Sequence, residues 1–150
     1  MKTKNSQLIF KEFYILASSL ISIPLEDESD GLINDFSIDI DFDIYKSEEI
    51  ENEFRIIVSI DGNDDENPTP GYCFGIIIEG YFGFDFDKKN DQNEIDVLLT
   101  RSAIPILIGQ LRNYLSTITA MSPYGKYILP SIDMNDLLEQ KDKMEHSEHD

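Results

Sequence analysis

The sequence predicts an α+β domain in which a four-stranded antiparallel sheet is followed by one long and one short helix. Three segments between Phe36 and Phe86 alternate apolar and polar residues, which is the period of half-buried strands. A later segment, from Ile104 to Met121, places apolar residues at steps of three and four, the period of an amphipathic helix. Strands that precede helices and follow one another through short connections indicate an antiparallel sheet with helices on one face.

Length and composition suit one domain with one hydrophobic core. The chain has 150 residues, of which 41% are hydrophobic and 28% charged, as is ordinary for a globular protein. The domain is expected to span residues 1–138. Residues 139–150 are polar and charged, and they are expected to form a flexible acidic tail.

Four strands are expected. The first lies between Gln7 and Leu25, where the periodicity also allows a helix as far as Leu20, and Pro24 suits a strand end because it lacks a backbone donor. Gly80 interrupts the last strand, which predicts a bulge or a close backbone approach. The apolar faces of the other three strands are Phe36, Ile38, Ile40, Phe42 and Ile44; Phe54, Ile56, Val58 and Ile60; and Tyr72, Phe74, Ile76, Ile78, Phe82, Phe84 and Phe86.

The helical segments have recognisable ends. The long helix is expected to begin at Pro105, since proline suits a first turn, and to end at the turn that contains Pro123 and Gly125. Asp133 has the position and side chain of an N-cap for a short helix from Met134 to about Gln140. The apolar stripe of the long helix is Ile104, Leu107, Ile108, Leu111, Leu115, Ile118 and Met121.

The connection between the two helices is unusually apolar. It is broken by Gly125 and Pro130, where polar residues would be usual for a surface loop. This connection therefore either packs onto the domain or binds something. Its large side chains are Tyr124, Tyr127, Ile128 and Leu129.

The order of these features resembles the C-terminal half of the SecB export chaperones. An apolar helix carries the run Arg112 to Leu115, a turn follows, and then come the run Tyr127 to Met134 and Leu137. The family typically shows an arginine, an apolar helix, a glycine-rich break, two prolines after a leucine, an aliphatic residue and an asparagine. Here Ser131 stands where the second proline is usual. The resemblance covers roughly Phe10 to Leu138 and favours a strand for the N-terminal segment.

The resemblance implies a homotetrameric chaperone for unfolded polypeptides or preproteins. SecB-like proteins are dimers of dimers that hold such chains in apolar grooves without ATP, with the long helices packed between two sheets. The client-binding candidates lie on the second strand and in the helix-connecting loop: Ile38, Ile40, Phe42, Tyr124, Tyr127 and Leu129. The long helix supplies the candidates for the oligomer interface, because one small sheet is not expected to cover its stripe: Ile104, Leu107, Leu111, Leu115 and Ile118.

The resemblance leaves the partner open. Export chaperones dock the SecA motor on acidic residues of the exposed sheet face, and here Leu20, Pro24 and Gly75 stand at those positions, which predicts weak or absent SecA binding. SecB-like chaperones also occur with toxin–antitoxin systems, where an antitoxin is the partner. A hypothesis from another class is a non-chaperone oligomeric module that binds a single folded partner.

Charge and cysteine content exclude several classes of partner. A formal charge of −18 and a pI near 4.2 argue against binding to nucleic-acid backbones or anionic membranes. A single Cys73 cannot form an internal disulfide, and the N-terminus lacks the apolar region of a signal peptide. The expected compartment is the cytoplasm. No apolar run reaches the length that spans a bilayer, so membrane insertion is not expected.

No cluster of residues predicts catalysis, a metal site or a cofactor. The row from Asp39 to Asp43 spaces its carboxylates about 7 Å apart, too far for one ion, so a solvated strand face is expected. The run Asp61 to Asp65 lacks the spacing of a calcium loop and is interpreted as a turn. His146 and His149 lie in the polar tail with no second ligand pair nearby in sequence. A non-enzymatic protein is therefore expected.

Overall fold

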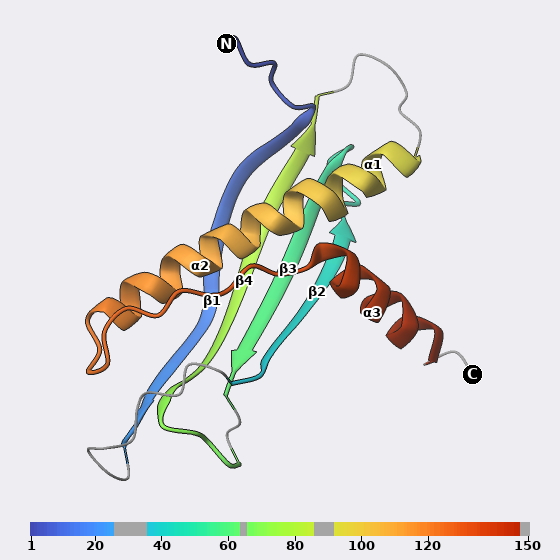
Figure 1. Cartoon of the computed structure of the whole chain (residues 1–150). Coiled ribbons are helices and arrows are strands. Elements are labelled where there is room, and N and C mark those ends of the chain that lie inside the picture. Colours follow the sequence, from blue (N-terminus) through green and yellow to red (C-terminus); the bar gives the residue numbers. More distant parts are fainter. Residues whose placement is uncertain (26–35, 64–65, 86–91, 148–150) are drawn as a thin grey trace.

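The computed structural model describes residues 1–25, 36–63, 66–85 and 92–147, and it confirms the predicted α+β fold. Four strands form one sheet in the order β1-β4-β3-β2, so the first two strands of the chain are its edges (Figure 1). All neighbouring strands are antiparallel. The strands are β1 (Leu8–Ile23), β2 (Ile38–Lys46), β3 (Glu53–Gly62) and β4 (Gly71–Phe84).

The N-terminal segment is a strand. β1 pairs with β4 from Leu8 to Ile23, and Pro24 follows directly, as the sequence predicts. The register shifts twice, once after Phe10 and once after Ile15. Irregularities of this kind bend an edge strand and hinder its pairing with other strands. The expected continuation of β4 to Phe86 lies outside the described residues.

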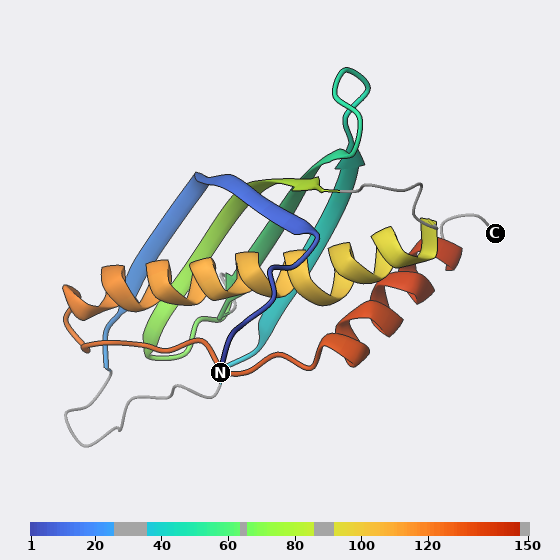
Figure 2. The ribbon, with the colours of Figure 1, turned by 90° about the horizontal axis from the view of Figure 1, so that it is seen from above.

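One helical rod crosses a single face of the sheet (Figures 1 and 2). It consists of α1 (Gln92–Leu98), a π-helical turn η1 (Leu99–Ala103) and α2 (Ile104–Ala120). The predicted start at Pro105 is confirmed for α2, which carries this proline in its first turn, but the rod as a whole begins earlier, at Gln92. In a regular α-helix the proline ring would clash with the carbonyl one turn earlier. The wider turn of η1, in which the Ile104 N–H bonds to the Leu99 carbonyl, ends just before this proline.

The core lies between the rod and the sheet. The apolar faces predicted for β3 and β4 point toward the rod, and Ile56, Val58 and Ile78 are fully buried. The rod comes very close to the sheet at Gly80, where a Cβ atom would lie 2.5 Å from Leu107 Cδ2. This confirms the close backbone approach that the glycine predicts.

The C-terminal helix α3 (Met134–Ser147) is longer than predicted. Asp133 is its N-cap, as expected, since its Oδ1 accepts two backbone N–H bonds of the first turn at 2.9 and 3.2 Å. The predicted end near Gln140 is wrong. Residues 139–147, expected to belong to a flexible tail, are helical, and Lys141 among them contacts β2. The last three residues of the expected tail lie outside the described part of the chain.

Candidate functional site

A groove of about 260 Å³ lies between the edge strand β2 and the segment that leads into α3. In Figure 1, α3 lies beside β2 at the edge of the sheet, and none of its side chains is fully buried. Four half-buried apolar residues from the two walls contribute to its lining: Ile38, Ile40, Ile132 and Leu137. We call this the β2 groove, and its other lining residues are Asp39, Ser131, Asp133, Asp136 and Gln140.

The β2 groove is acidic at its rim. Asp39, Asp133 and Asp136 are exposed and line it, and none of the described lining residues is basic. The net charge of −18 strengthens the negative potential around it. The groove therefore suits an apolar segment that also carries basic side chains, whereas an acidic segment would be repelled.

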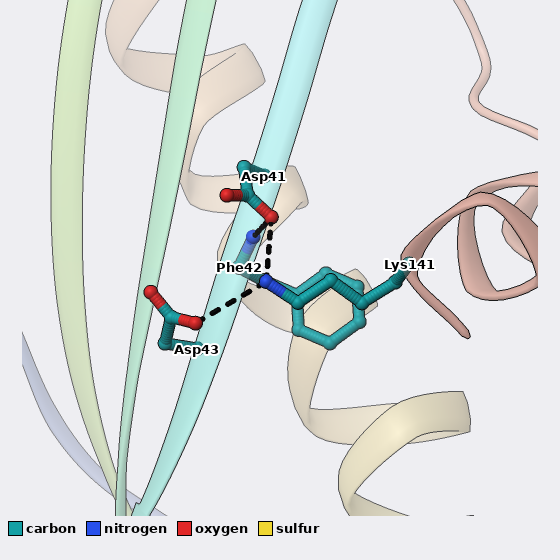
Figure 3. Close-up of polar contacts among 4 residues, drawn as sticks. All are labelled: Asp41, Phe42, Asp43 and Lys141. Atoms are coloured by element: carbon teal, nitrogen blue, oxygen red, sulfur yellow. Dashed lines mark hydrogen bonds and ion pairs between the residues drawn. The ribbon is translucent and has the colours of Figure 1, made fainter. Parts of the chain in front are cut away.

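Lys141 ties α3 to β2 beside the groove (Figure 3). Its ammonium nitrogen lies 2.9 Å from Asp41 Oδ1 and 3.2 Å from Asp43 Oδ1. The same nitrogen is 5.4 Å from the centroid of the Phe42 ring, which it covers. Both carboxylates remain accessible to water, so the ion pairs supply a modest tie between helix and strand.

The Lys141 contact makes the docking of α3 depend on pH. Burial raises the pKa of Asp41, but hydrogen bonds from Lys141 and the Phe42 N–H outweigh it and hold this pKa below its usual value. A lowered carboxyl pKa stabilises docking at neutral pH, and this contribution is lost as the pH falls through it. Burial lowers the pKa of Lys141, whereas its two carboxylates raise it, with a net rise, so its contribution is lost only in alkali.

We therefore expect α3 to loosen from β2 below about pH 4, near the ordinary aspartate pKa. NMR shifts of the Leu137 and Met144 methyl groups, followed from pH 7 to pH 3, measure this. In a Lys141→Gln variant the acid transition should be absent, because the tie is already lost. Lys143→Gln, at an exposed position on the same helix, is the matched control. An unchanged acid transition in Lys141→Gln would contradict the assignment.

The structure separates the six predicted client-binding residues. Ile38 and Ile40 line the β2 groove. Phe42, Tyr127 and Leu129 are core residues, exposed by 7%, 6% and 1%, so a client cannot reach them in the folded protomer. The prediction that these three residues bind a client is therefore corrected, and they are assigned to the core. Tyr124, half-buried, donates its hydroxyl to a carbonyl at the end of β1, and its contact with a client stays a prediction.

The helix-connecting loop is buried at alternate positions because it is extended and bonded to α2. Arg112 Nε donates to the Leu129 carbonyl at 2.9 Å, and its guanidinium also donates to the Pro130 carbonyl at 3.1 Å. Thr119 Oγ1 accepts the N–H of Tyr127 at 2.9 Å. The apolar connection was expected either to pack onto the domain or to bind something. Tyr127 and Leu129 pack onto the domain.

Sequence reasoning missed Ile132 and Leu137, which form the second wall of the groove. Both carry a local signal. Ile132 follows an extended stretch whose alternate residues are buried, and Leu137 lies one turn after the N-cap Asp133, where a helix turns its apolar side to the protein. What the sequence does not show is that this segment returns to β2.

The predicted oligomer-interface residues lie inside one protomer. Ile104, Leu107, Leu111 and Leu115 are at most 1% exposed, and Ile118 is half-buried. The expectation that one sheet cannot cover these side chains is corrected for the four buried ones, because strands of 16 and 14 residues let the sheet extend beneath the rod. An interface between subunits cannot be built on these four side chains, whereas an interface role for Ile118 stays a prediction.

The three positions aligned with SecA-docking acids have different surroundings, and one of them, Pro24, is exposed just after the end of β1. A Cβ on Gly75 would lie 2.8 Å from the Asp61 carboxylate, on the sheet face away from the rod. Leu20 instead packs against the core. Weak SecA binding stays a prediction.

The described ranges contain no group of three or more side chains that could hold a metal ion. Their helices include none that is long and apolar enough to cross a membrane. The Nδ1 of His146 lies 2.7 Å from the Asp142 carbonyl of its own helix, and His149 falls outside the described residues.

These features define a class of fold: a four-stranded antiparallel sheet in the order β1-β4-β3-β2, crossed on one face by a long helix and flanked at β2 by a shorter one. It is the SecB-like fold.

A particular solved structure carries this assignment. The Mycobacterium tuberculosis Rv1957 SecB-like chaperone, in complex with a ChAD peptide from the Rv1956 HigA1 antitoxin, superposes with a TM-score of 0.60. It is 11% identical in sequence, and the match covers 84% of this chain and 91% of that one. A protein of unknown function from Streptococcus agalactiae, also 11% identical, matches with a TM-score of 0.45 over 83% of this chain and 97% of that chain. No protein-family model and no curated protein sequence matches the chain.

Proposed function

We propose that the protein is an ATP-independent chaperone that holds non-native polypeptides in the β2 groove. The observation that carries the proposal is the groove itself, which combines apolar side chains with an acidic rim on a SecB-like fold. Extended chains expose apolar side chains and an unpaired backbone, and many weak contacts in such a groove bind them without demanding one sequence. The protein acts by binding and performs no catalysis.

The proposal predicts that the natural chain slows aggregation of chemically denatured citrate synthase without ATP. Leu137→Asp should bind denatured chains roughly tenfold or more weakly, because losing an apolar contact of this size costs about 1.5–3 kcal/mol. Light scattering of the aggregating enzyme measures the holding, and circular dichroism confirms that the variant is folded. Val97→Asp, at a position 57% exposed on α1, is the matched control. Equal holding by Leu137→Asp and the natural chain would place the site elsewhere.

A second candidate partner is an antitoxin segment. The similar Rv1957 chaperone was solved with an antitoxin peptide, and that complex favours this candidate over an export partner. Breadth of binding separates a general chaperone from a dedicated module. A general chaperone holds several unrelated denatured proteins with similar affinity, whereas a dedicated module holds one.

The chaperone proposal includes a homotetramer. Support comes from β1, an edge strand with large apolar side chains in water: Ile9, Phe13, Tyr14, Leu16 and Ile21, exposed by 39–55%. Light scattering of the natural chain in neutral buffer should give about four times the 17.2 kDa protomer mass. A stable monomer would contradict the proposed tetramer. If the Ile21→Asp substitution lowers the mass of the oligomer, an interface between subunits includes β1.

A further inference from the structure

The β2 strand presents every second backbone unit to the groove. Its hydrogen bonds to β3 fall on odd-numbered residues, as shown at the two ends by Asn63 N–H to the Ser37 carbonyl (3.1 Å) and Ser47 N–H to the Glu53 carbonyl (2.9 Å). In an antiparallel pair, a residue points its N–H and its C=O to the same side. The intervening residues, Ile38, Ile40, Phe42 and Ile44, therefore direct both groups away from β3.

The two edges of the sheet differ in how well they can pair with a further strand. β1 is interrupted by two register shifts. β2 pairs with β3 in one unbroken register from Ile38 to Lys46, and among the described residues no strand lies on its other side. An edge of this kind is a template for another strand.

The open part of this edge is short and ends at Phe42. There the backbone N–H donates to the Asp41 carboxylate at 2.8 Å, and Lys141 binds the same carboxylate oxygen at 2.9 Å (Figure 3). Ile38 and Ile40, by contrast, line the β2 groove opposite Ser131 to Asp133. The groove therefore gives access to the edge of β2 at Ile38 and Ile40. From Phe42 onward the Asp41–Lys141 pair blocks this edge.

Resting on the proposed chaperone function, we propose that the bound segment enters the β2 groove as a fifth strand, hydrogen-bonded to β2 at Ile38 and Ile40. Strand addition explains binding without sequence demand, because the bonds are made by backbone. The occupant is an extended peptide of another protein with basic side chains for Asp39 and Asp136. A second copy fits poorly, since its own β2 carries three aspartates and its net charge is −18.

The test compares the affinities of two peptides that have the same charge and differ only in which backbone nitrogens are methylated. A fluorescein-labelled octapeptide of alternating lysine and valine is made in two forms, N-methylated either at the valines or at the lysines. Neighbouring residues of a strand point their N–H groups to opposite sides, so only one form blocks pairing with β2. Fluorescence anisotropy should show at least tenfold weaker binding for one form and little change for the other. Equal affinities of the two forms, whether strong or weak, overturn strand addition.

A protein variant tests the same bond from the other side. Ile40→Pro removes the N–H that points into the groove and leaves the β2–β3 bonds, which fall on the neighbouring residues. Ile40→Ala removes the side chain but keeps the N–H. The proline variant should bind the unmethylated octapeptide at least tenfold more weakly than the alanine variant, and equal binding overturns the proposal. If the proline variant does not fold, the methylated peptides on the natural chain still decide.

The two proposals fail in different ways. Equal affinities for the methylated peptides, together with normal suppression of citrate synthase aggregation, overturn strand addition and leave the chaperone function standing. Failure to suppress aggregation overturns the chaperone function. A natural chain that binds no peptide, but whose oligomeric mass falls in the Ile40→Pro variant, has a second copy on this edge, and that result also overturns the proposal.

Discussion

A Leu111→Asp variant is expected to lose its folded protomer. Leu111 is 1% exposed and lies between α2 and the sheet. Removing a buried leucine costs about 2–5 kcal/mol, and burying an unpaired carboxylate adds several more. Domains of this size are stable by only about 5–15 kcal/mol, so the folded population should collapse. Far-UV circular dichroism and a urea titration measure the loss.

This outcome differs from the one that the amphipathic stripe alone suggests, namely that an acid at Leu111 or Leu115 splits an oligomer into folded subunits. Light scattering combined with circular dichroism separates the two. Folded protomers of 17.2 kDa with an unchanged spectrum would contradict the core assignment. Met121→Asp, 80% exposed just beyond the same helix, is the matched control and should unfold at the same urea concentration as the natural chain.

A Gly80→Val variant should be less stable by about 1–3 kcal/mol, as expected for an overpacked core. An added Cβ would lie 2.5 Å from Leu107 Cδ2 and 3.1 Å from Phe82 Cε2, and both side chains are fully buried. Valine favours strands more than glycine does, so a loss of stability reports the packing conflict alone. The midpoint of urea unfolding provides the measurement.

A Gly109→Ala variant should change the stability in the opposite direction from Gly80→Val. Gly109 lies within α2, and nothing lies within 4 Å of an added Cβ. Alanine should therefore stabilise the helix by up to about 1 kcal/mol. A stabilising Gly80→Val would show that α2 does not press on β4 at this point.

The sheet was predictable because its signals are local. Alternation along β2 and β3 identifies both strands and the faces that they bury, and Gly80 marks the close approach of the helix. The start of the rod was not predictable from Pro105, because the residue that usually opens a helix here follows a π turn. Such turns are rare and occur mostly as single turns within α-helices, and here one lets α1 and α2 continue as a single rod.

The candidate site was only half predictable. Ile38 and Ile40 follow from the period of β2. Their partners Ile132 and Leu137 lie more than 90 residues further along the chain, and no local pattern shows that the two segments meet. Tyr127 and Leu129 are as apolar as a binding surface, and only their hydrogen-bonded neighbours, Thr119 and Arg112, distinguish a packed loop from an open one.

The π turn at Leu99–Ala103 holds one residue more than a regular α-helical turn, since the Ile104 N–H bonds to the carbonyl five residues back. Deleting a single residue such as Thr100 would let this turn close as a regular α-helical turn, with α1 and α2 nearly in the same phase. Ile95 and Leu107 would then both keep facing the sheet. A deletion within α1 or α2 would instead rotate one half of the rod by about 100° relative to the other. The rod therefore tolerates the loss of one residue at this turn better than elsewhere along its length.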